Sequence, residues 1–261
     1  MDLALIGAVA FLASGLTLLS GFGLGTLLLP AFALFLPVHV AVAATGVVHL
    51  LNNLFKGALL WRQADWRIVL RFGLPAVPAA ILGAWLLGRL GDTGRLFTWN
   101  AGAWTAGPTA AGLIVGLVLI ALALFELHPA AQKVRAPARL MPLGGAAMGF
   151  LGGLTGQQGA LRSIFLLRSG MNAAHFIATG VMIAILVDLS RVPTYAVQLA
   201  GTASALSVRD IWLIVTGTLA ALAGAWLATR YLKKVTIAAV RYIVAALMIA
   251  IGGELAAGAI G

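Results

Sequence analysis

Apolar stretches separated by short polar connections run along the whole chain. An apolar run of about 20 residues crosses the hydrocarbon core of a bilayer as a helix. This pattern predicts an all-α polytopic membrane protein with ten transmembrane segments, at about 3–20, 22–36, 39–61, 67–90, 108–126, 139–155, 158–170, 173–191, 208–231 and 236–258. The segments 22–36 and 158–170 are short and each follows a glycine-rich break, so a full span and a re-entrant hairpin both stay open for them.

Composition excludes most other protein classes. Hydrophobic residues make up 62% of the 261 residues and charged residues 9%, against about 45–50% and about 25% in soluble domains. The chain has no cysteine, which excludes disulfides, thiolate metal sites and a cysteine nucleophile. It also lacks a P-loop, a zincin motif and a nucleophile elbow. We therefore expect neither an enzyme nor a protein that binds a metal or cofactor.

The excess of basic residues predicts orientation. The net charge is +10, and basic residues gather on cytoplasmic loops. If all ten segments cross, one side receives only Arg89, Arg95, Arg191 and Arg209, whereas re-entrant short segments would divide the basic residues almost evenly. We therefore expect ten crossings of the cytoplasmic membrane, with both termini outside the cytoplasm. Nucleic acid is not expected as a partner, because no basic stripe or aromatic platform accompanies the charge.

The sequence repeats itself about 134–141 residues apart. The predicted repeats are residues 1–127 and 139–261, joined by a basic cytoplasmic linker at 128–138. Three matches keep the same order: Ala44-Thr45-Gly46-Val47 with Ala178-Thr179-Gly180-Val181, Gly83-Ala84-Trp85-Leu86 with Gly224-Ala225-Trp226-Leu227, and the break at 21–25 with the break at 156–160.

Five spans per repeat would turn the second copy upside down relative to the first. Inverted repeats with broken helices at corresponding positions are typical of secondary transporters. A break exposes backbone N–H and C=O groups that lipid cannot satisfy, so we expect a substrate site there. The alternative is helix packing through small residues. The candidate gating glycines are Gly21, Gly23, Gly25, Gly156 and Gly159.

The glycine-rich stretch from Gly21 to Pro30, the Ala-Thr-Gly-Val segment after it and their echoes in the second half resemble the sulfite exporter TauE/SafE family. The resemblance covers nearly the whole chain. It implies movement of small sulfur-containing or organic anions across the cytoplasmic membrane. The second break departs from the family pattern, because Phe165 stands where Pro30 predicts proline.

A polar stripe marks the third segment. His49, Asn52, Asn53 and Lys56 have the spacing i, i+3, i+4, i+7 of one helical face, and Thr45 extends it by a turn. Polar residues at membrane depth face a cavity or the bundle interior, so we expect all five to contribute to substrate binding. The alternatives are snorkelling of Lys56 to the headgroups and hydrogen bonds between helices for the two asparagines.

The seventh segment carries Gln157, Gln158, Arg162 and Ser163 just after the break. A guanidinium offers five fixed donors that match oxyanions, and a helix N-terminus favours an anion. These side chains therefore predict part of an anion site. The alternative for Arg162 is a structural pair with Asp188 or Glu254.

The eighth segment adds Thr179 as a further candidate for substrate binding. Because histidine changes charge near neutral pH, His49 or His175 is a candidate carrier of a coupling proton. Asp188 lies three residues from Arg191, near the expected outer end of this segment. We therefore expect a surface ion pair between them.

Together these features predict a secondary transporter, with export favoured, of a small anion such as sulfite, an organosulfonate or a small carboxylate. The mechanism would be alternating access between the two repeats. The alternatives are a membrane scaffold without transport, a proton-coupled importer of an organic anion, and a cation transporter, for which acidic residues are too few. The expected partners are the solute and the lipid bilayer, and a homodimer is one possible assembly.

Overall fold

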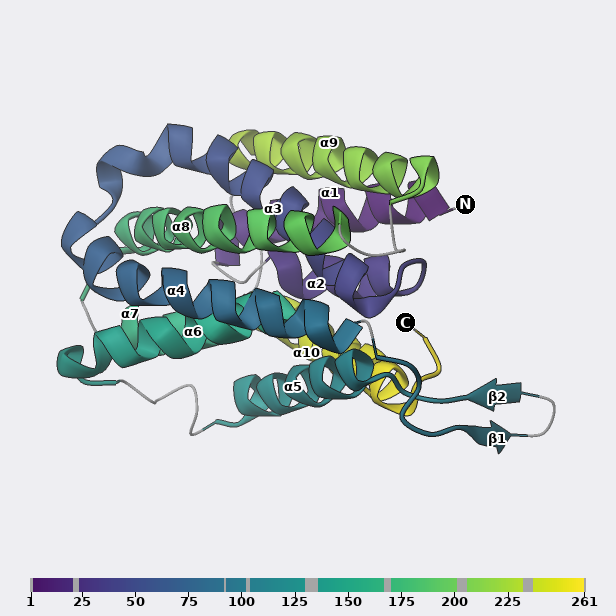
Figure 1. The fold of residues 1–261 in the computed structure, drawn as a ribbon. Coiled ribbons are helices and arrows are strands. Elements are labelled where there is room, and N and C mark those ends of the chain that lie inside the picture. Colours follow the sequence, from purple (N-terminus) through teal and green to yellow (C-terminus); the bar gives the residue numbers. More distant parts are fainter. Residues whose placement is uncertain are drawn as a thin grey trace.

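The computed structural model describes residues 2–20, 24–91, 93–101, 104–129, 136–166, 170–200, 206–231 and 237–260. Its described part is a bundle of ten α-helices with one small β-hairpin (Figure 1). The helices are α1 (Asp2–Ser20), α2 (Leu24–Ala33), α3 (Val38–Leu60), α4 (Trp66–Gly91), α5 (Ala110–Leu127), α6 (Met141–Thr155), α7 (Gly159–Leu166), α8 (Ala173–Ala200), α9 (Val208–Tyr231) and α10 (Ile237–Ala257). The 3-10 turns η1 (Trp61–Gln63) and η3 (Ala138–Leu140) precede α4 and α6.

Each of the ten apolar segments corresponds to one helix. The main difference is at α8, which continues to Ala200 instead of ending near Arg191. The residues after Arg191 are mostly apolar and stay helical through Pro193. The expectation that Arg191 lies at an outer loop is therefore wrong, because this side chain is fully buried.

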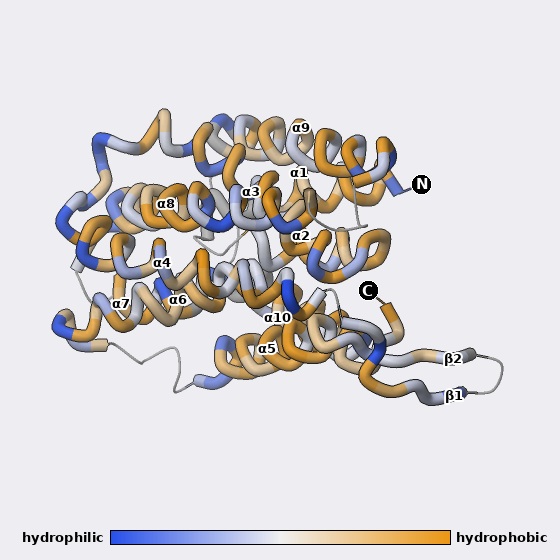
Figure 2. The backbone as a smooth tube through the Cα atoms, in the orientation of Figure 1, coloured by the Kyte–Doolittle hydropathy of each residue, from blue (hydrophilic) through white to orange (hydrophobic). Residues whose placement is uncertain are grey.

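The helix lengths fit a membrane protein. In the part of the chain that the structure describes, five helices are long and apolar enough to cross a bilayer: those within Val38–Gln63, Trp66–Gly91, Ala110–Leu127, Ala173–Ala200 and Val208–Ala228. Helices α2 and α7 have 10 and 8 residues, which at about 1.5 Å per residue is half or less of a hydrocarbon core about 30 Å thick. Figure 2 shows hydrophobic colour along most helices, whereas the connection between α3 and α4 is hydrophilic.

Helix packing relates the first five helices to the last five. Helix α4 packs along α6 and against α8, while α9 packs along α1 and against α3. Helix α3 also packs against α8, and α5 against α10. If α1–α5 are matched in order with α6–α10, the two contacts of α4 are exchanged with the two contacts of α9. The α3–α8 and α5–α10 contacts are each converted into themselves.

Two glycines of the repeated Gly-Ala-Trp-Leu motif lie at close approaches between these helices. Gly83 on α4 faces the carbonyl oxygen of Phe150 on α6, and Gly224 on α9 faces that of Phe11 on α1. A Cβ at either position would collide with the opposing backbone. Small residues allow such approach between helices in a membrane, so glycine is required at both crossings.

Each copy of this motif also carries a cation–π contact. The guanidinium carbon of Arg89 lies 5.4 Å from the centre of a Trp85 ring, and that of Arg230 lies 5.5 Å from a Trp226 ring. Both tryptophans are exposed on the outside of the bundle. The two contacts occupy opposite ends of the bundle, because α4 and α9 end on opposite sides (Figure 1).

The hairpin of β1 (Trp99–Ala101) and β2 (Trp104–Ala106) extends beyond one end of the bundle (Figure 1). The Trp99 indole donates to the carbonyl oxygen of Ala257 at 2.8 Å, which ties the hairpin to the last turn of α10. Both chain termini lie at this same end (Figure 1). The opposite end carries the connection from α3 to α4 and the start of α8.

Candidate substrate site

The two glycine-rich breaks meet inside the bundle. A Cβ on Gly25, at the start of α2, would lie 3.1 Å from the carbonyl oxygen of Gly156, which follows α6. Beside this contact, Thr26 Oγ1 donates to Gln157 Oε1 at 2.9 Å. Of the other candidate gating glycines, Gly159 is the first residue of α7, and Gly21 and Gly23 lie outside the described residues.

Glycine is required at the second break by backbone geometry. Gly156 has φ of +78° and its N–H bonds to the carbonyl oxygen of Gly152 at 3.0 Å. This left-handed conformation ends a helix and strains any residue that carries a Cβ. The local sequence therefore stops α6 inside the bundle, before α7 begins.

Two side chains of α8 donate to carbonyl groups in the last turn of α6. Arg191 Nη1 donates to the Gly152 carbonyl oxygen at 2.7 Å, and the Tyr195 hydroxyl donates to that of Gly153. A cation at a helix C-terminus is favoured by the helix dipole. Arg191 therefore stabilises the break itself.

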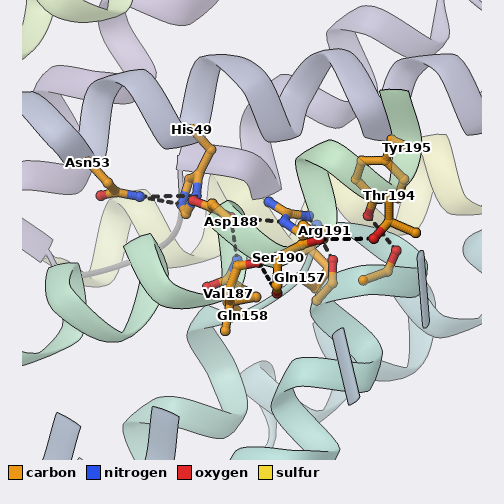
Figure 3. Close-up of polar contacts among 12 residues, drawn as sticks. His49, Asn53, Gln157, Gln158, Val187, Asp188, Ser190, Arg191, Thr194 and Tyr195 are labelled. Carbon is orange, nitrogen blue, oxygen red and sulfur yellow. Dashed lines mark hydrogen bonds and ion pairs between the residues drawn. The ribbon is translucent and has the colours of Figure 1, made fainter. Parts of the chain in front are cut away.

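Asp188 is the centre of a buried polar cluster, shown in Figure 3. Its Oδ2 lies 2.6 Å from His49 Nδ1. Its Oδ1 accepts from Arg191 Nε at 2.8 Å and from Gln158 Nε2 at 2.9 Å. Asp188 and Arg191 are both 0% exposed, so the expected surface ion pair is wrong. Burial of these charges is tolerated because each has a partner.

His49 links this cluster to the polar stripe of α3. The Asn53 Nδ2 atom lies 3.0 Å from His49 Nδ1. One helical turn on the other side of His49, the methyl group of Thr45 lies 3.5 Å from the position of a Gly25 Cβ. The stripe thus faces both the buried carboxylate and the meeting point of the two breaks, as its spacing predicts.

Several buried polar atoms here have no hydrogen-bond partner among the described residues. Three of them surround the meeting point of the breaks: Thr45 Oγ1, Gln157 Nε2 and Arg191 Nη2. Asn52 Nδ2 and Gln158 Oε1 are two further cases. Leaving a buried donor unpaired costs about 1–3 kcal/mol. Three donor groups around one point are therefore suited to a ligand that carries acceptor oxygens.

Lys56 and Arg162 add positive charge nearby. Lys56 is 5% exposed and Arg162 is 9% exposed, so both side chains are buried. Arg162 Nη1 donates to the carbonyl oxygen of Gly180 at 2.9 Å, and the charges of Arg162 and Lys56 interact. The carboxylate of Asp188, proposed above as an alternative partner of Arg162, is instead bound by Arg191.

The remaining candidates have local partners. Asn52 Oδ1 accepts from Ser14 at 3.0 Å, and Ser163 donates to the Gly159 carbonyl within α7 at 2.9 Å. Thr179 accepts from the backbone N–H of Asp65 at 2.9 Å, and the exposed His175 bonds to Asn172. The hydrogen bonds described for Ser163, Thr179 and His175 thus connect them to residues other than those bonded to Asp188.

Sequence reasoning missed Arg191 and Tyr195 as parts of this site. The available signal was the i, i+3 spacing of Asp188 and Arg191 followed by a further apolar stretch of α8. Two opposite charges one turn apart in a long helix can be buried together, because they neutralise each other. The predicted helix end at residue 191 placed the pair at the surface instead.

Comparison with known proteins decides the family. The family model described as sulfite exporter TauE/SafE matches residues 6–255. The chain belongs to the TauE/SafE family. The resemblance expected from the glycine breaks is therefore confirmed, and the protein is an integral membrane protein of a transporter family. Searches of curated proteins and of solved structures found no match.

The site of this TauE/SafE protein is built from backbone breaks and buried side chains. Within the described residues, no group of three or more His, Cys, Asp or Glu side chains could hold a metal ion. The chemistry available at the meeting point is hydrogen-bond donation and positive charge.

Proposed function

We propose that this TauE/SafE protein is a secondary transporter that binds a small oxyanion where its two helix breaks meet. The observation that carries the proposal is the set of buried, unpartnered donors on Thr45, Gln157 and Arg191 around that point. A hydroxyl, an amide and a guanidinium complement the oxygens of sulfite, a sulfonate or a carboxylate. The N-termini of α2 and α7 add favourable backbone dipoles.

The charge balance of the buried region also favours an anion. Among the described residues, Lys56, Arg162 and Arg191 are buried together with one carboxylate, that of Asp188, which leaves an excess of two positive charges. Buried charge is expensive without compensation, so an anionic substrate would neutralise part of it. We assign Arg162 and Lys56 a supporting role in attracting the anion, because Arg191 lies closest to the break.

We further propose that residues 1–127 and 139–261 are inverted repeats joined by a linker at 128–138, and that they move against each other in alternating access. The helix contacts support this, because α4 packs on α6 and α8 in the same way as α9 packs on α1 and α3. The close approaches at Gly83 and Gly224 also occupy equivalent positions in the two repeats. An inside-negative potential supplies about 2.3 kcal/mol per charge per 100 mV. Export of an anion would therefore need no ATP.

The orientation proposal is that ten segments cross the cytoplasmic membrane with both termini outside. Among the described residues, basic side chains at the bundle end where α3 joins α4 outnumber those at the end with the hairpin, as the positive-inside rule requires of a cytoplasmic end. The first group contains Arg62, Arg67, Arg71, Arg139 and Arg230, and the second Arg89, Arg95 and Arg209.

A second candidate function is proton-coupled uptake of an organic anion. The 2.6 Å contact between His49 and Asp188, both buried, favours it. A histidine in such a pair can take up a proton and share its charge with the carboxylate. The proton would then enter next to the anion site.

The test is anion flux into proteoliposomes that contain the purified protein. We expect sulfite to move in response to a membrane potential, and Gln157→Glu to reduce flux at least tenfold, because its carboxylate places a competing anion beside Arg191. Gln63→Glu, at an exposed position of η1, is the matched control. A native protein that moves no anion would contradict the proposal and favour a scaffold.

Arg162→Gln tests the supporting role of Arg162 in the same assay. A smaller loss of flux than that of Gln157→Glu is expected, because Arg162 contacts the Gly180 carbonyl rather than the break. Unchanged flux would remove Arg162 from the site.

A further inference from the structure

A cavity of about 270 Å³ lies beside the polar stripe, between α3, α8 and α9. Its lining is apolar, with Phe55, Leu59, Ala174, Ile177 and Ala225 among its residues, except for Lys56. For comparison, an apolar cavity of about 150 Å³ is large enough to bind benzene. This cavity therefore has room for an apolar group of at least that size.

Among the described residues that line the cavity, only Lys56 carries a charge. It is 5% exposed and forms no hydrogen bond or ion pair with any residue that the structure describes. Its charged neighbour is Arg162, another cation, so the neighbour supplies no counter-charge. A buried ammonium group needs an acceptor, and the side chains of the described lining residues offer none.

The cavity reaches the surface of the protein. Leu59 is 58% exposed and Ala174 is also exposed. They belong to the last turn of α3 and the first turn of α8, at the end of the bundle where α3 joins α4 (Figure 1). Lys56 is one turn from Asn53 on the same helical face, so the cavity adjoins the polar stripe that leads to His49.

We propose that this cavity binds an amphiphilic monoanion, with its carboxylate or sulfonate on Lys56 and an apolar group of about six carbons along the apolar wall. As a substrate site, it rests on the transport function proposed above, and it adds organic anions with an apolar body to the small oxyanions that bind where the breaks meet. A small, strongly hydrated ion such as sulfite would lose water to a wall that offers no donors. An apolar body gains from the same burial.

The experiment measures binding of sulfonates to the purified protein in a neutral detergent, by calorimetry. Sulfonates stay ionised, so the head group is constant along the series methanesulfonate, butanesulfonate, hexanesulfonate and benzenesulfonate. We expect affinity to rise about fourfold for each added methylene. Lys56→Met should weaken benzenesulfonate binding at least tenfold, since it removes the charge and keeps the length of the side chain.

Two substitutions of alanine distinguish binding in the cavity from binding to the membrane-facing surface. Ala174→Leu fills the cavity and should weaken hexanesulfonate binding more than methanesulfonate binding. Ala58→Leu adds the same volume at an exposed position of α3 that does not line the cavity, and should leave the affinity series unchanged. An affinity that is equal across the series, or equal in native protein and Lys56→Met, would overturn the proposal.

A lipid phosphate is the other source of an anion with an apolar body. If short-chain phosphatidylglycerol binds through Lys56 and benzenesulfonate does not, the cavity is a lipid site and the proposal fails. Measuring anion flux in proteoliposomes tests the proposed transport function independently of binding in the cavity. Sulfite flux without benzenesulfonate binding contradicts the cavity alone, whereas benzenesulfonate binding without any anion flux supports the cavity and contradicts transport.

Discussion

Thr26 and Gln157 are 131 residues apart in the chain and share a buried hydrogen bond of 2.9 Å from Thr26 Oγ1 to Gln157 Oε1. This bond orients the Gln157 amide so that its Nε2 atom stays without a protein partner among the described residues. The donor that we assign to the substrate is therefore positioned by the other half of the chain. The site requires both halves to be folded against each other.

Thr45→Val should separate function from stability. The substitution keeps the shape of the side chain and removes a buried hydroxyl that has no partner in the described part of the protein. We expect sulfite flux to fall about tenfold, since a hydrogen bond to a charged group contributes about 1.5–3 kcal/mol, while thermal stability is unchanged or higher. Thr218→Val is the control, because its hydroxyl bonds to the Ile214 carbonyl within α9. Equal flux in both variants would exclude Thr45 from the site.

Asp188→Asn should destabilise the protein strongly. It leaves Arg191 buried without its counter-charge, which costs about 3–5 kcal/mol. The measurement is the thermal unfolding temperature in detergent, with a decrease on the order of 10 °C expected for a chain of this size. Asp2→Asn, at the exposed pair with Arg209, should leave the unfolding temperature almost unchanged, because exposed ion pairs add little stability. Similar decreases for both variants would contradict the central role of Asp188.

Gly83→Ala and Gly224→Ala should destabilise to a similar extent, about 1–3 kcal/mol each, because each added methyl group meets the backbone of the helix packed against it. Gly253→Ala in α10 is the matched control, since nothing lies within 4 Å of its added Cβ. That variant should be neutral or more stable, by up to about 1 kcal/mol. The measurement is the thermal unfolding temperature of the three variants. An unchanged unfolding temperature for Gly83→Ala would show that α4 and α6 can move apart without loss of stability.

His49→Gln tests proton coupling. Glutamine keeps a donor for Asp188 and cannot titrate. If His49 carries the proton, acid outside the vesicles drives anion uptake by the native protein, and the variant loses this dependence on the pH gradient. Flux is measured with the membrane potential set to zero. His128→Gln, in the connection after α5, is the control, and a variant that keeps the native response to pH would place the coupling elsewhere.

Sequence periodicity predicted the helices well and the site only in part. The apolar runs and the break at Gly156 depend on local residue types, so each predicted segment corresponds to one helix. The stripe from Thr45 to Lys56 was also correctly placed inside the bundle. Its partner across the interface could not be found, because nothing in the single sequence indicates that Asp188 lies opposite His49.

Arg191 shows why burial of charge is difficult to predict. From sequence alone, an arginine near the end of an apolar run is interpreted as a loop residue, because burying an unpaired guanidinium in lipid is unfavourable. Here Asp188, one turn earlier on α8, and the carbonyl of Gly152 provide partners. The second of these lies on α6, 39 residues away in the chain, and the folded bundle brings it to Arg191.

The two Trp–Arg pairs of the repeated motif have a consequence for how the protein sits in its membrane. Trp85 with Arg89 and Trp226 with Arg230 are exposed on helices that end at opposite sides of the bundle. Indole rings prefer the interface and guanidinium groups extend toward the headgroups. The two pairs therefore lie at the two membrane interfaces, at a fixed distance from each other. In a bilayer whose hydrocarbon core is thinner than this distance, we expect the whole bundle to tilt relative to the membrane normal.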